Sequence, residues 1–287
     1  MSAKAAYLED RGVVSVTGAE AAAFLQGLFT NDVVGLAPGE ARFAALLSPQ
    51  GKILVDFFVV RLDEGATPRF LLDAPRALCP DLTKKLVLYR LRARLDIADR
   101  SDELGVAAWW DGAPLAGAFR DARAPEMGWR RIAPRSEISG LGDAGYDAHR
   151  IACGTPKGGV DFAYGDAFPH DANLDLIAGV DFAKGCYVGQ EVVSRVQHRG
   201  TARKRVVPVR FDGAAPAAGT EIRAGDVGVG AMGSSTGQRG LATLRIDKAE
   251  GAALTCDGRP LTADLRGFSP QGSPSPLAGN GPAAGGR

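Results

Sequence analysis

Apolar residues in the N-terminal half of the chain follow two spacings, one typical of strands and one typical of helices. Residues 5–17 are rich in valine and alternate loosely, which predicts short strands. The apolar runs 41–48 and 53–62 flank the turn Ser48–Gly51 and predict a β-hairpin. Residues 75–91 repeat apolar side chains at helical spacing and predict a helix.

A second helix is expected to begin just after the first strands. Thr17 is expected to be its N-cap, because Glu20 follows three positions later, which is the spacing of a capping box. A third helix is expected around 143–153, ending at Gly154. Glycine, proline and asparagine punctuate residues 157–183 and predict loops there.

The pattern changes after Arg205. From Val206 to Leu265, short apolar runs alternate with glycine and proline turns, which indicates a small β-barrel or sandwich. We therefore expect a first region over residues 1–202 and a barrel over residues 203–268. Residues 269–287 contain 5 Gly, 4 Pro and 3 Ser, which cannot bury a core and predict a disordered tail.

Length, composition and charge narrow the class of protein. A chain of 287 residues that is 45% hydrophobic and 23% charged can form two or three packed units. Its net charge of +1 gives no reason to require nucleic acid or an anionic membrane as a partner. The first residues lack an apolar leader, and no window approaches the ~18 apolar residues of a membrane span. We therefore expect a cytoplasmic protein.

Cysteine and histidine usage offers no ready metal site. The four cysteines are too widely spaced for a CxxC zinc or cluster site and too few for a disulfide framework, which favours a reducing compartment. The histidines match no metal template, and we expect structural or surface roles for them. These residues are Cys79, Cys153, Cys186 and Cys256, and His149, His170 and His198.

The segment Gly228–Gly233 matches the dinucleotide pattern G-x-G-x-x-G. That pattern binds a nucleotide only between a strand and a helix, and the residues that follow it, Ser234–Gly240, are turn-forming. We therefore interpret its glycines as turns of the barrel.

Cys186 differs from the other cysteines in its neighbours. Gly185 and Gly189 bracket it and permit a tight backbone path. Lys184 would favour the thiolate if its ammonium group folds back toward the sulfur, and a helix beginning at Gln190 would lower the thiol pKa through its dipole. The alternative is a buried and inert cysteine.

A run of basic residues follows this segment. Arg195, Arg199 and Arg203 are four positions apart, Lys204 and Arg205 adjoin them, and no acidic residue lies between 192 and 211. On a helix the arginines would share a face. The run is either an anion site for a polyglutamate tail, a phosphate or RNA, or a solvated surface at a domain junction.

The segment Lys184–Glu191, K-G-C-Y-V-G-Q-E, resembles the signature of YgfZ-type folate-binding proteins, which are related to the glycine-cleavage T-protein, an aminomethyltransferase. Phe24–Asp32 is similar to the family's F-L-Q-G-x-x-T-N-D segment, and Leu46–Ile53 resembles its L-x-x-x-G-x-I turn. Residues 203–268 fit its C-terminal barrel. The resemblance covers about residues 7–268.

This resemblance implies an α+β fold, with two packed α+β units around a central cavity and a small C-terminal β-barrel. It also implies that the cavity binds tetrahydrofolate or a one-carbon derivative. The implied role is assembly or repair of [4Fe–4S] enzymes, including radical enzymes that modify tRNA. The implied partners are iron–sulfur carrier or client proteins.

The resemblance also suggests roles for individual residues. Cys186 is the expected working thiolate, and Lys184 is expected to tune it electrostatically. A pterin needs buried polar partners, and a glutamyl tail needs a cation. The expected cofactor-binding residues are Asn31, Asp56, Tyr187, Gln190, Glu191 and Arg195, with the last facing the tail.

Two other functions stay open. A folate-dependent aminomethyl or methyl transferase would be the activity if the protein is an enzyme. T-protein relatives, however, have an acidic pair where this chain has Val55 and Asp56, and some relatives have glutamate at the position of Ala152. The other alternative is a non-catalytic adaptor that docks on cluster carriers, or on RNA through residues 195–205.

Overall fold

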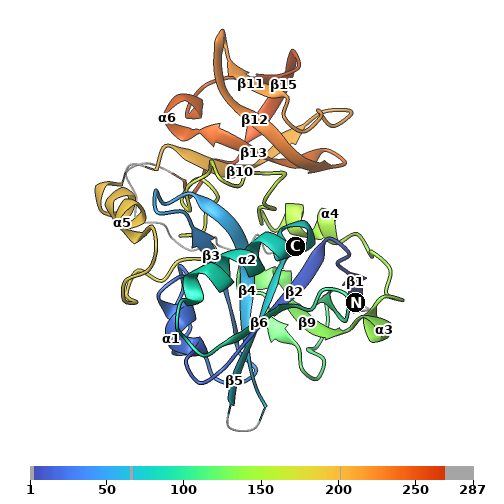
Figure 1. Ribbon diagram of the computed structural model, residues 1–287. Helices are drawn as coiled ribbons and strands as arrows, with labels where there is room; N and C mark the ends of the chain where they lie inside the picture. The colour runs from blue at the N-terminus through green and yellow to red at the C-terminus, as the bar shows by residue number, and fades with distance from the viewer. Residues whose placement is uncertain (1–2, 65–66, 201, 269–287) are drawn as a thin grey trace, which may run out of the picture.

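A five-stranded antiparallel sheet organises the N-terminal region (Figure 1). The computed structural model describes residues 3–64, 67–200 and 202–268, without the side chains of residues 63 and 64. The strands, in spatial order, are β3 (Ala41–Leu47), β4 (Ile53–Glu64), β5 (Thr67–Pro75), β2 (Arg11–Thr17) and β6 (Asp96–Asp99).

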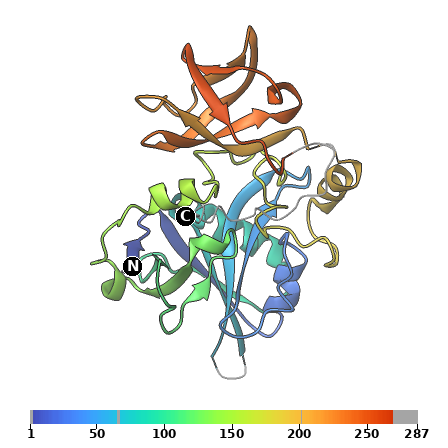
Figure 2. The same cartoon turned by 180° about the vertical axis from the view of Figure 1, so that it is seen from behind.

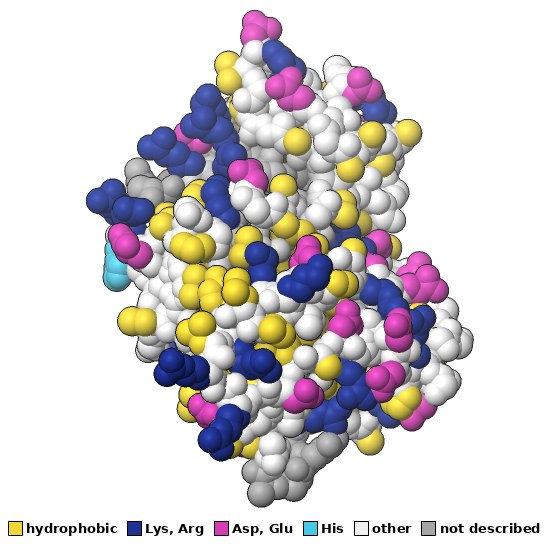
Figure 3. Space-filling model, in the orientation of Figure 1, with side chains coloured by type: hydrophobic (Ala, Val, Ile, Leu, Met, Phe, Trp, Pro, Cys, Tyr) yellow, Lys and Arg dark blue, Asp and Glu magenta, His cyan; other side chains and the backbone are white. Residues whose placement is uncertain are grey.

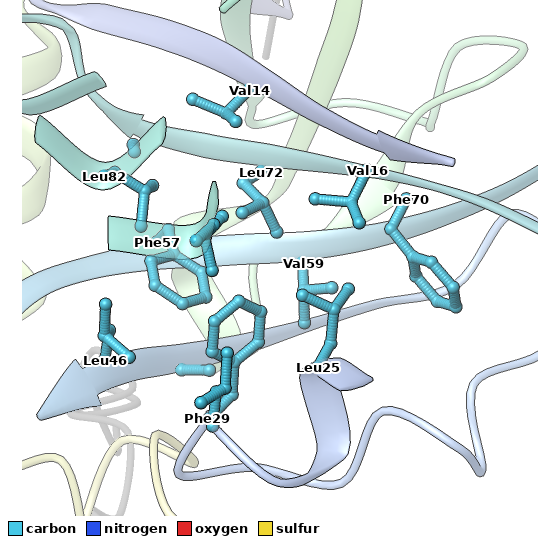
Figure 4. Close-up of a cluster of buried hydrophobic side chains, with 14 of the residues drawn as sticks. Val14, Val16, Leu25, Phe29, Leu46, Phe57, Val59, Phe70, Leu72 and Leu82 are labelled. Atoms are coloured by element: carbon cyan, nitrogen blue, oxygen red, sulfur yellow. The ribbon is translucent and has the colours of Figure 1, made fainter. Parts of the chain in front are cut away.

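Two helices cover one face of this sheet. They are α1 (Ala21–Gln26) and α2 (Cys79–Arg90), the latter preceded by the short helix η1 (Arg76–Leu78). Leu25 of α1 and Leu82 of α2 point toward Phe57 and Val59 of β4, as Figure 4 shows. This apolar layer excludes water and fixes the sheet, because each buried aliphatic or aromatic side chain contributes about 1.5–3 kcal/mol.

The opposite face of the sheet packs against a second, four-stranded sheet. Its spatial order is β1 (Lys4–Tyr7), β7 (Leu104–Trp110), β9 (Trp129–Pro134) and β8 (Phe119–Arg120). Phe58 of β4 meets Phe119 of β8 at a ring-centroid distance of 5.8 Å. Three short helices complete this unit: η2 (Pro125–Met127), α3 (Arg135–Ile138) and α4 (Tyr146–Ala152).

A closed six-stranded barrel forms a separate layer beyond the two sheets, as Figure 2 shows from behind. It follows α5 (Gln190–Arg199), and a short helix, α6 (Ile246–Ala249), lies between two of its strands. The strands, in spatial order, are β10 (Lys204–Phe211), β13 (Arg239–Arg245), β12 (Val227–Thr236), β11 (Glu221–Ala224), β14 (Leu254–Cys256) and β15 (Arg259–Ala263).

A buried carboxylate joins the barrel to the rest of the protein. Asp161 accepts hydrogen bonds from the backbone N–H and the hydroxyl of Ser234, both at 2.7 Å, and pairs with Arg150 of α4 at 2.9 Å. Gly233 is required beside it, because a Cβ there would lie 2.3 Å from the Asp161 carboxylate. Ion pairing satisfies the buried charge and fixes the orientation of the barrel.

The structure confirms the expected α+β fold class with its C-terminal barrel. Two local expectations were wrong. Thr17 is not an N-cap, because it lies in β2 and pairs with β5 and β6. The segment Gly228–Gly233 lies within strand β12 rather than in turns. The division at residues 202 and 203 stays a prediction, and the tail 269–287 lies outside the described residues.

Candidate functional site

The segment that contains Cys186 is a loop held against the end of α1. The Asp181 carboxylate accepts hydrogen bonds from the backbone N–H groups of Ala183 at 2.8 Å and Lys184 at 3.2 Å, which forms a tight turn. The Asp181 N–H in turn donates to the carbonyl of Thr30 at 3.0 Å. The loop therefore follows the residues just after α1.

Lys184 anchors this loop. Its ammonium group donates hydrogen bonds to the carbonyl oxygens of Gln26 at 2.7 Å and Asn31 at 3.0 Å, and also to that of Phe29. Burial lowers the pKa of Lys184 to about 8. The structure thus directs this cation to the end of α1, where helix carbonyls lack partners. Lys184 was expected to favour the Cys186 thiolate if its ammonium group folded back toward the sulfur, and its three hydrogen bonds go instead to these carbonyls.

At the other end of the loop, Gly189 packs closely against the β3–β4 turn, and Gly51 of that turn packs against the start of α5. Gly189 has φ 81°, and a Cβ on it would lie 2.6 Å from the Ser48 carbonyl. Gly51 has φ 79°, and a Cβ on it would lie 2.9 Å from Val192. Gly185, by contrast, has open space around it. Of the two glycines that bracket Cys186, only Gly189 is required sterically.

Cys186 itself is exposed, unlike the other three cysteines. Among the described residues its thiol forms no hydrogen bond, and all four cysteines are free. Cys79 and Cys256 are buried, and burial raises the pKa of Cys79 to about 11 and that of the half-buried Cys153 to about 12. The accessible thiol of this protein is therefore Cys186.

The remaining predicted site residues, from Tyr187 to Arg195, lie in different environments. Tyr187 is buried in the core beside β3, and burial raises its pKa to about 12. Gln190 and Glu191 open α5, where the acid is exposed and favoured by the helix dipole. Arg195 is exposed further along α5.

A cavity of about 720 Å³ opens beside this loop. Its walls are aromatic, with Phe43 and Phe119 from the two sheets, Trp129 from β9 and Phe182 from the loop. Its polar groups come from Asn31, Arg42, Glu40, Arg120 and Asp181. This size and mixture suit a small flat ligand, because such sites combine apolar walls with a few polar groups.

The predicted residues divide between this cavity and other places. Asn31 lines it, but its side-chain amide already donates to the carbonyls of Phe43 and Ala178, each at 2.8 Å. Asp56 is buried and accepts a hydrogen bond from the Tyr164 hydroxyl, outside the cavity lining. Of the predicted site residues, all within the described part of the chain, only Asn31 lines the cavity.

The structure shows which side of the sheet an acid at position 55, as in T-proteins, would face. Val55 packs in the layer under α1 and α2, whereas Asp56 lies on the other face of β4. Neighbouring strand residues point to opposite faces. An acid at position 55 would therefore face the helices and not the side of the sheet where the cavity lies. Ala152 is exposed at the end of α4.

A buried charge network behind the cavity was missed by the sequence analysis. Asp73 accepts from Arg11 at 2.6 Å and from Arg130 at 2.7 Å. Asp121 pairs with Arg123 at 2.6 Å, and the Arg123 guanidinium lies 5.3 Å from the centre of the Phe43 ring, whose side chain lines the cavity. The sequence did contain one indication of this network. Asp73 lies in the apolar strand β5, and a buried carboxylate needs a cationic or hydrogen-bonding partner.

One member of the basic run is separated from the others. Arg205 turns inward, where it pairs with Asp175 at 2.6 Å and donates to the His170 carbonyl. Arg195, Arg199, Arg203 and Lys204 are exposed. Of the histidines, His170 is buried, His149 stacks on Trp110 and His198 is on the surface.

Two regions of the chain match known family models. Residues 8–77 match the GCVT N-terminal domain, and residues 203–271 match the CAF17 C-terminal beta-barrel domain. The first covers α1 and most of the five-stranded sheet, and the second covers the barrel.

The fold is also that of a solved structure. Glycine cleavage system aminomethyltransferase T from Bartonella henselae superimposes with a TM-score of 0.74, covering 94% of this chain and 87% of that chain. The sequences are 19% identical. At this identity the similarity shows a common fold only.

The location expected from the sequence is contradicted by the relatives below, which are named mitochondrial proteins. The cytoplasmic expectation depended on the lack of a recognisable leader, and such an absence does not identify a compartment. Among the described helices, none is long and apolar enough to cross a membrane.

Curated relatives extend over most of this chain. A protein of Mycosarcoma maydis, named iron-sulfur cluster assembly factor IBA57 homolog, is 36% identical over 72% of this chain, which spans 57% of the relative's length. The mouse and human proteins named iron-sulfur cluster assembly factor IBA57 are 34% and 35% identical, covering 85% of this chain and 78% of their own length. The chain therefore belongs to the IBA57 family of proteins.

Proposed function

We propose that this protein supports the assembly or repair of iron–sulfur proteins, with Cys186 as its working thiol. The observation that carries the proposal is the placement of Cys186. It is the exposed cysteine of the chain, in a loop fixed by Lys184 at one end and Gly189 at the other. The names of the relatives, iron-sulfur cluster assembly factors, support the same function.

A fixed and exposed thiol suits a transient ligand to an iron–sulfur cluster. Clusters bind through cysteine thiolates, usually four of them. Because Cys153 and Cys79 are shielded, one protein molecule offers one accessible ligand, and the others must come from a carrier or client protein. The cluster is then cargo that passes across this surface.

A reduced folate is the proposed ligand of the cavity. A pterin is flat, and the rings of Phe43, Phe119 and Trp129 provide apolar faces. Arg42 and Arg120 would hold an anionic tail. The residues of the cavity therefore fit the group, with Asn31 as the one earlier candidate among them. Tetrahydrofolate would supply a one-carbon carrier beside the loop that holds Cys186.

The finer features of the family resemblance are part of this proposal. The motif Lys184–Glu191 would place the protein in the YgfZ-type branch. Its clients would then be [4Fe–4S] proteins, and radical enzymes that modify tRNA would depend on it. Lys184 is proposed to position Cys186 by fixing the loop. Tyr187, packed in the core, and Gln190 and Glu191, at the start of α5, are proposed to support the same loop.

The test is complementation of a strain that lacks its own copy of this protein, with activity of a [4Fe–4S] enzyme as the readout. Cys186→Ala should fail to restore activity, whereas Cys153→Ala should restore it. Full restoration by Cys186→Ala would remove the thiol from the proposal. Tetrahydrofolate binding to the purified protein, followed by tryptophan fluorescence, tests the cavity separately.

A further inference from the structure

A strip of basic side chains runs from α5 across the start of the barrel to α6. Figure 3 shows Lys and Arg side chains gathered over these elements at the left edge of the molecule. The exposed members on α5 and just after it are Arg195, Arg199, Arg203 and Lys204. On the barrel side, Lys248 is exposed and Arg245 is half-buried. These six residues are called the basic strip below.

The backbone brings the two halves of the basic strip together. Strand β10 pairs with β13 so that Lys204 lies opposite Arg245. The Ile246 N–H donates to the Arg203 carbonyl at 2.8 Å, which places Arg203 beside the start of α6. The strip is therefore one surface built from two regions that are distant in sequence.

Most of its charge is uncompensated. Arg245 pairs with Asp247 at 2.8 Å. Within the described residues, the other five members form no ion pair within 4 Å. Arg205 differs from these five, because it is buried and pairs with Asp175. A surface with several unpaired cations and few anions attracts a negatively charged partner.

The basic strip follows the Cys186 loop in the chain. The loop 181–189 leads directly into α5, and Arg195 lies five residues beyond Gln190. At 1.5 Å per helical residue, this is about 7–8 Å along the helix axis. A partner that covers both the basic strip and the loop before α5 would contact the exposed thiol and Phe182, whose side chain is 40% exposed and lines the cavity.

We propose that the basic strip is the docking surface for an acidic protein that exchanges an iron–sulfur cluster at Cys186. This inference rests on the proposed function and adds the kind of partner and the place where it binds. An exposed aromatic and a thiol, flanked by charged residues, form the apolar centre and polar rim of a protein interface.

A protein partner fits better than a nucleic acid. Asp247 pairs with Arg245 beside the basic strip, and Glu191 and Glu250 border it. The charges of these acids would repel a phosphate backbone. Base stacking needs exposed aromatic rings, and in the described residues the exposed aromatic near this surface is Phe182, at the cavity rim. A folded protein partner can place carboxylates opposite the cations of the basic strip and its own lysines or arginines opposite the neighbouring acids.

The first test measures binding of two defined probes to the full-length protein by fluorescence anisotropy. The probes are a short poly-L-glutamate peptide and a single-stranded RNA of equal charge. The wild type should bind poly-L-glutamate saturably, and Arg195→Glu with Arg199→Glu should weaken it by about tenfold or more. A matched control, Lys85→Glu with Arg92→Glu, changes the same charge at exposed positions on and after α2 and should bind like the wild type.

Two results of this test would overturn the proposal. One is the absence of saturable poly-L-glutamate binding by the wild type. The other is tighter binding of the RNA than of poly-L-glutamate, which would make the basic strip a nucleic-acid surface.

The second test is complementation with the same variants, read out by [4Fe–4S] enzyme activity. Arg195→Glu with Arg199→Glu should lose restoration while the Lys85→Glu with Arg92→Glu control keeps it. Full restoration by the strip variant, together with failure of Cys186→Ala, would reject the docking surface and leave the proposed function standing. Full restoration by Cys186→Ala would instead reject the proposed function.

Discussion

The ammonium group of Lys184 donates a hydrogen bond to the backbone carbonyl of Asn31 at 3.0 Å, across more than half of the chain. Together with its bonds to the carbonyls of Gln26 and Phe29, this contact ties the Cys186 loop to the end of α1. The hydrogen bonds of this lysine thus go to a helix end, and its electrostatic effect on the thiol stays a prediction. The position of Cys186 depends on that anchor.

The first prediction concerns the pH dependence of this anchor. Burial lowers the pKa of Lys184 to about 8, from 10.5 for a free side chain. Between these values the unfolded chain binds more protons at this site than the folded protein, so the Lys184 contribution to the free energy of unfolding rises with pH. Urea unfolding measures the free energy of unfolding of both proteins. The value for wild type minus the value for Lys184→Met should therefore increase as the pH is raised from about 8 to about 10.5.

The control for this experiment is Lys85→Met, which removes an exposed lysine from α2. Because Lys85 is exposed on the surface, its replacement should change the free energy of unfolding by less than about 0.5 kcal/mol. A constant difference for Lys184→Met over the same pH range would show that its amine titrates like an ordinary lysine in the folded protein.

The second prediction compares the two glycines that flank Cys186. Gly189→Ala would place a methyl group against the Ser48 carbonyl at a residue with φ 81°, so unfolding should become easier by about 2 kcal/mol or more. Gly185→Ala meets open space and should change stability by less than about 0.5 kcal/mol. Urea unfolding of both variants measures this, and equal effects would contradict the close contact at Gly189.

These glycines illustrate what the sequence could and could not reveal. The motif marked both as special, and the spacing of apolar residues correctly located the hairpin, α2 and a barrel after Arg205, although Gly228–Gly233 lies in strand β12. Only the packed structure shows that Gly189 contacts the β3–β4 turn, because that contact joins residues far apart in the chain. Periodicity reports which face of an element is buried and not what lies opposite it.

Thr17 and Asp73 also show that local sequence signals do not identify contacts between distant residues. The capping-box spacing of Thr17 and Glu20 is a local signal, and strand pairing on both sides of Thr17 overrode it. The Glu20 carboxylate instead accepts from the Arg94 N–H at 3.1 Å. Asp73 required a buried cation, but nothing local identified Arg11 and Arg130 as its partners.

The third prediction tests this buried charge network. Asp73→Ala leaves the Arg130 guanidinium, which is 2% exposed, without its main partner, so the free energy of unfolding should fall by about 3–5 kcal/mol. Asp102→Ala removes an exposed partner of Arg76 and should cost about 0–1 kcal/mol. Urea unfolding compares the two. A small effect of Asp73→Ala would mean that water or another anion takes the place of the carboxylate.

The fourth prediction concerns thiol accessibility. Cys186 is exposed, while burial raises the pKa of Cys79 to about 11 and of Cys153 to about 12. Because the thiolate is the reactive form, a thiol reagent at neutral pH should label the native protein once and rapidly, at Cys186. Mass spectrometry of the labelled protein identifies the site, and Cys186→Ala should abolish the rapid phase. Rapid labelling of Cys153 would show that α4 opens in solution.

The last prediction asks whether the cavity holds the folate. Ala122 lines the cavity and is itself exposed, so a larger side chain there can fill the space without displacing the core. Ala122→Phe should therefore weaken tetrahydrofolate binding by about tenfold or more, since a filled pocket loses the contacts that bury a ligand. Stability in urea should stay within about 0.5 kcal/mol of wild type, as is usual for surface changes.

Ala113→Phe is the matched control, because Ala113 is exposed but does not line the cavity. It should bind tetrahydrofolate like the wild type in anaerobic fluorescence titrations, with Trp129 in the cavity wall as a local reporter. If Ala122→Phe binds as tightly as the wild type, the folate lies elsewhere. The hydrogen-bonded pair of buried Asp56 and half-buried Tyr164 would then be the next candidate site, since Asp56 lies on the same side of the sheet as the cavity.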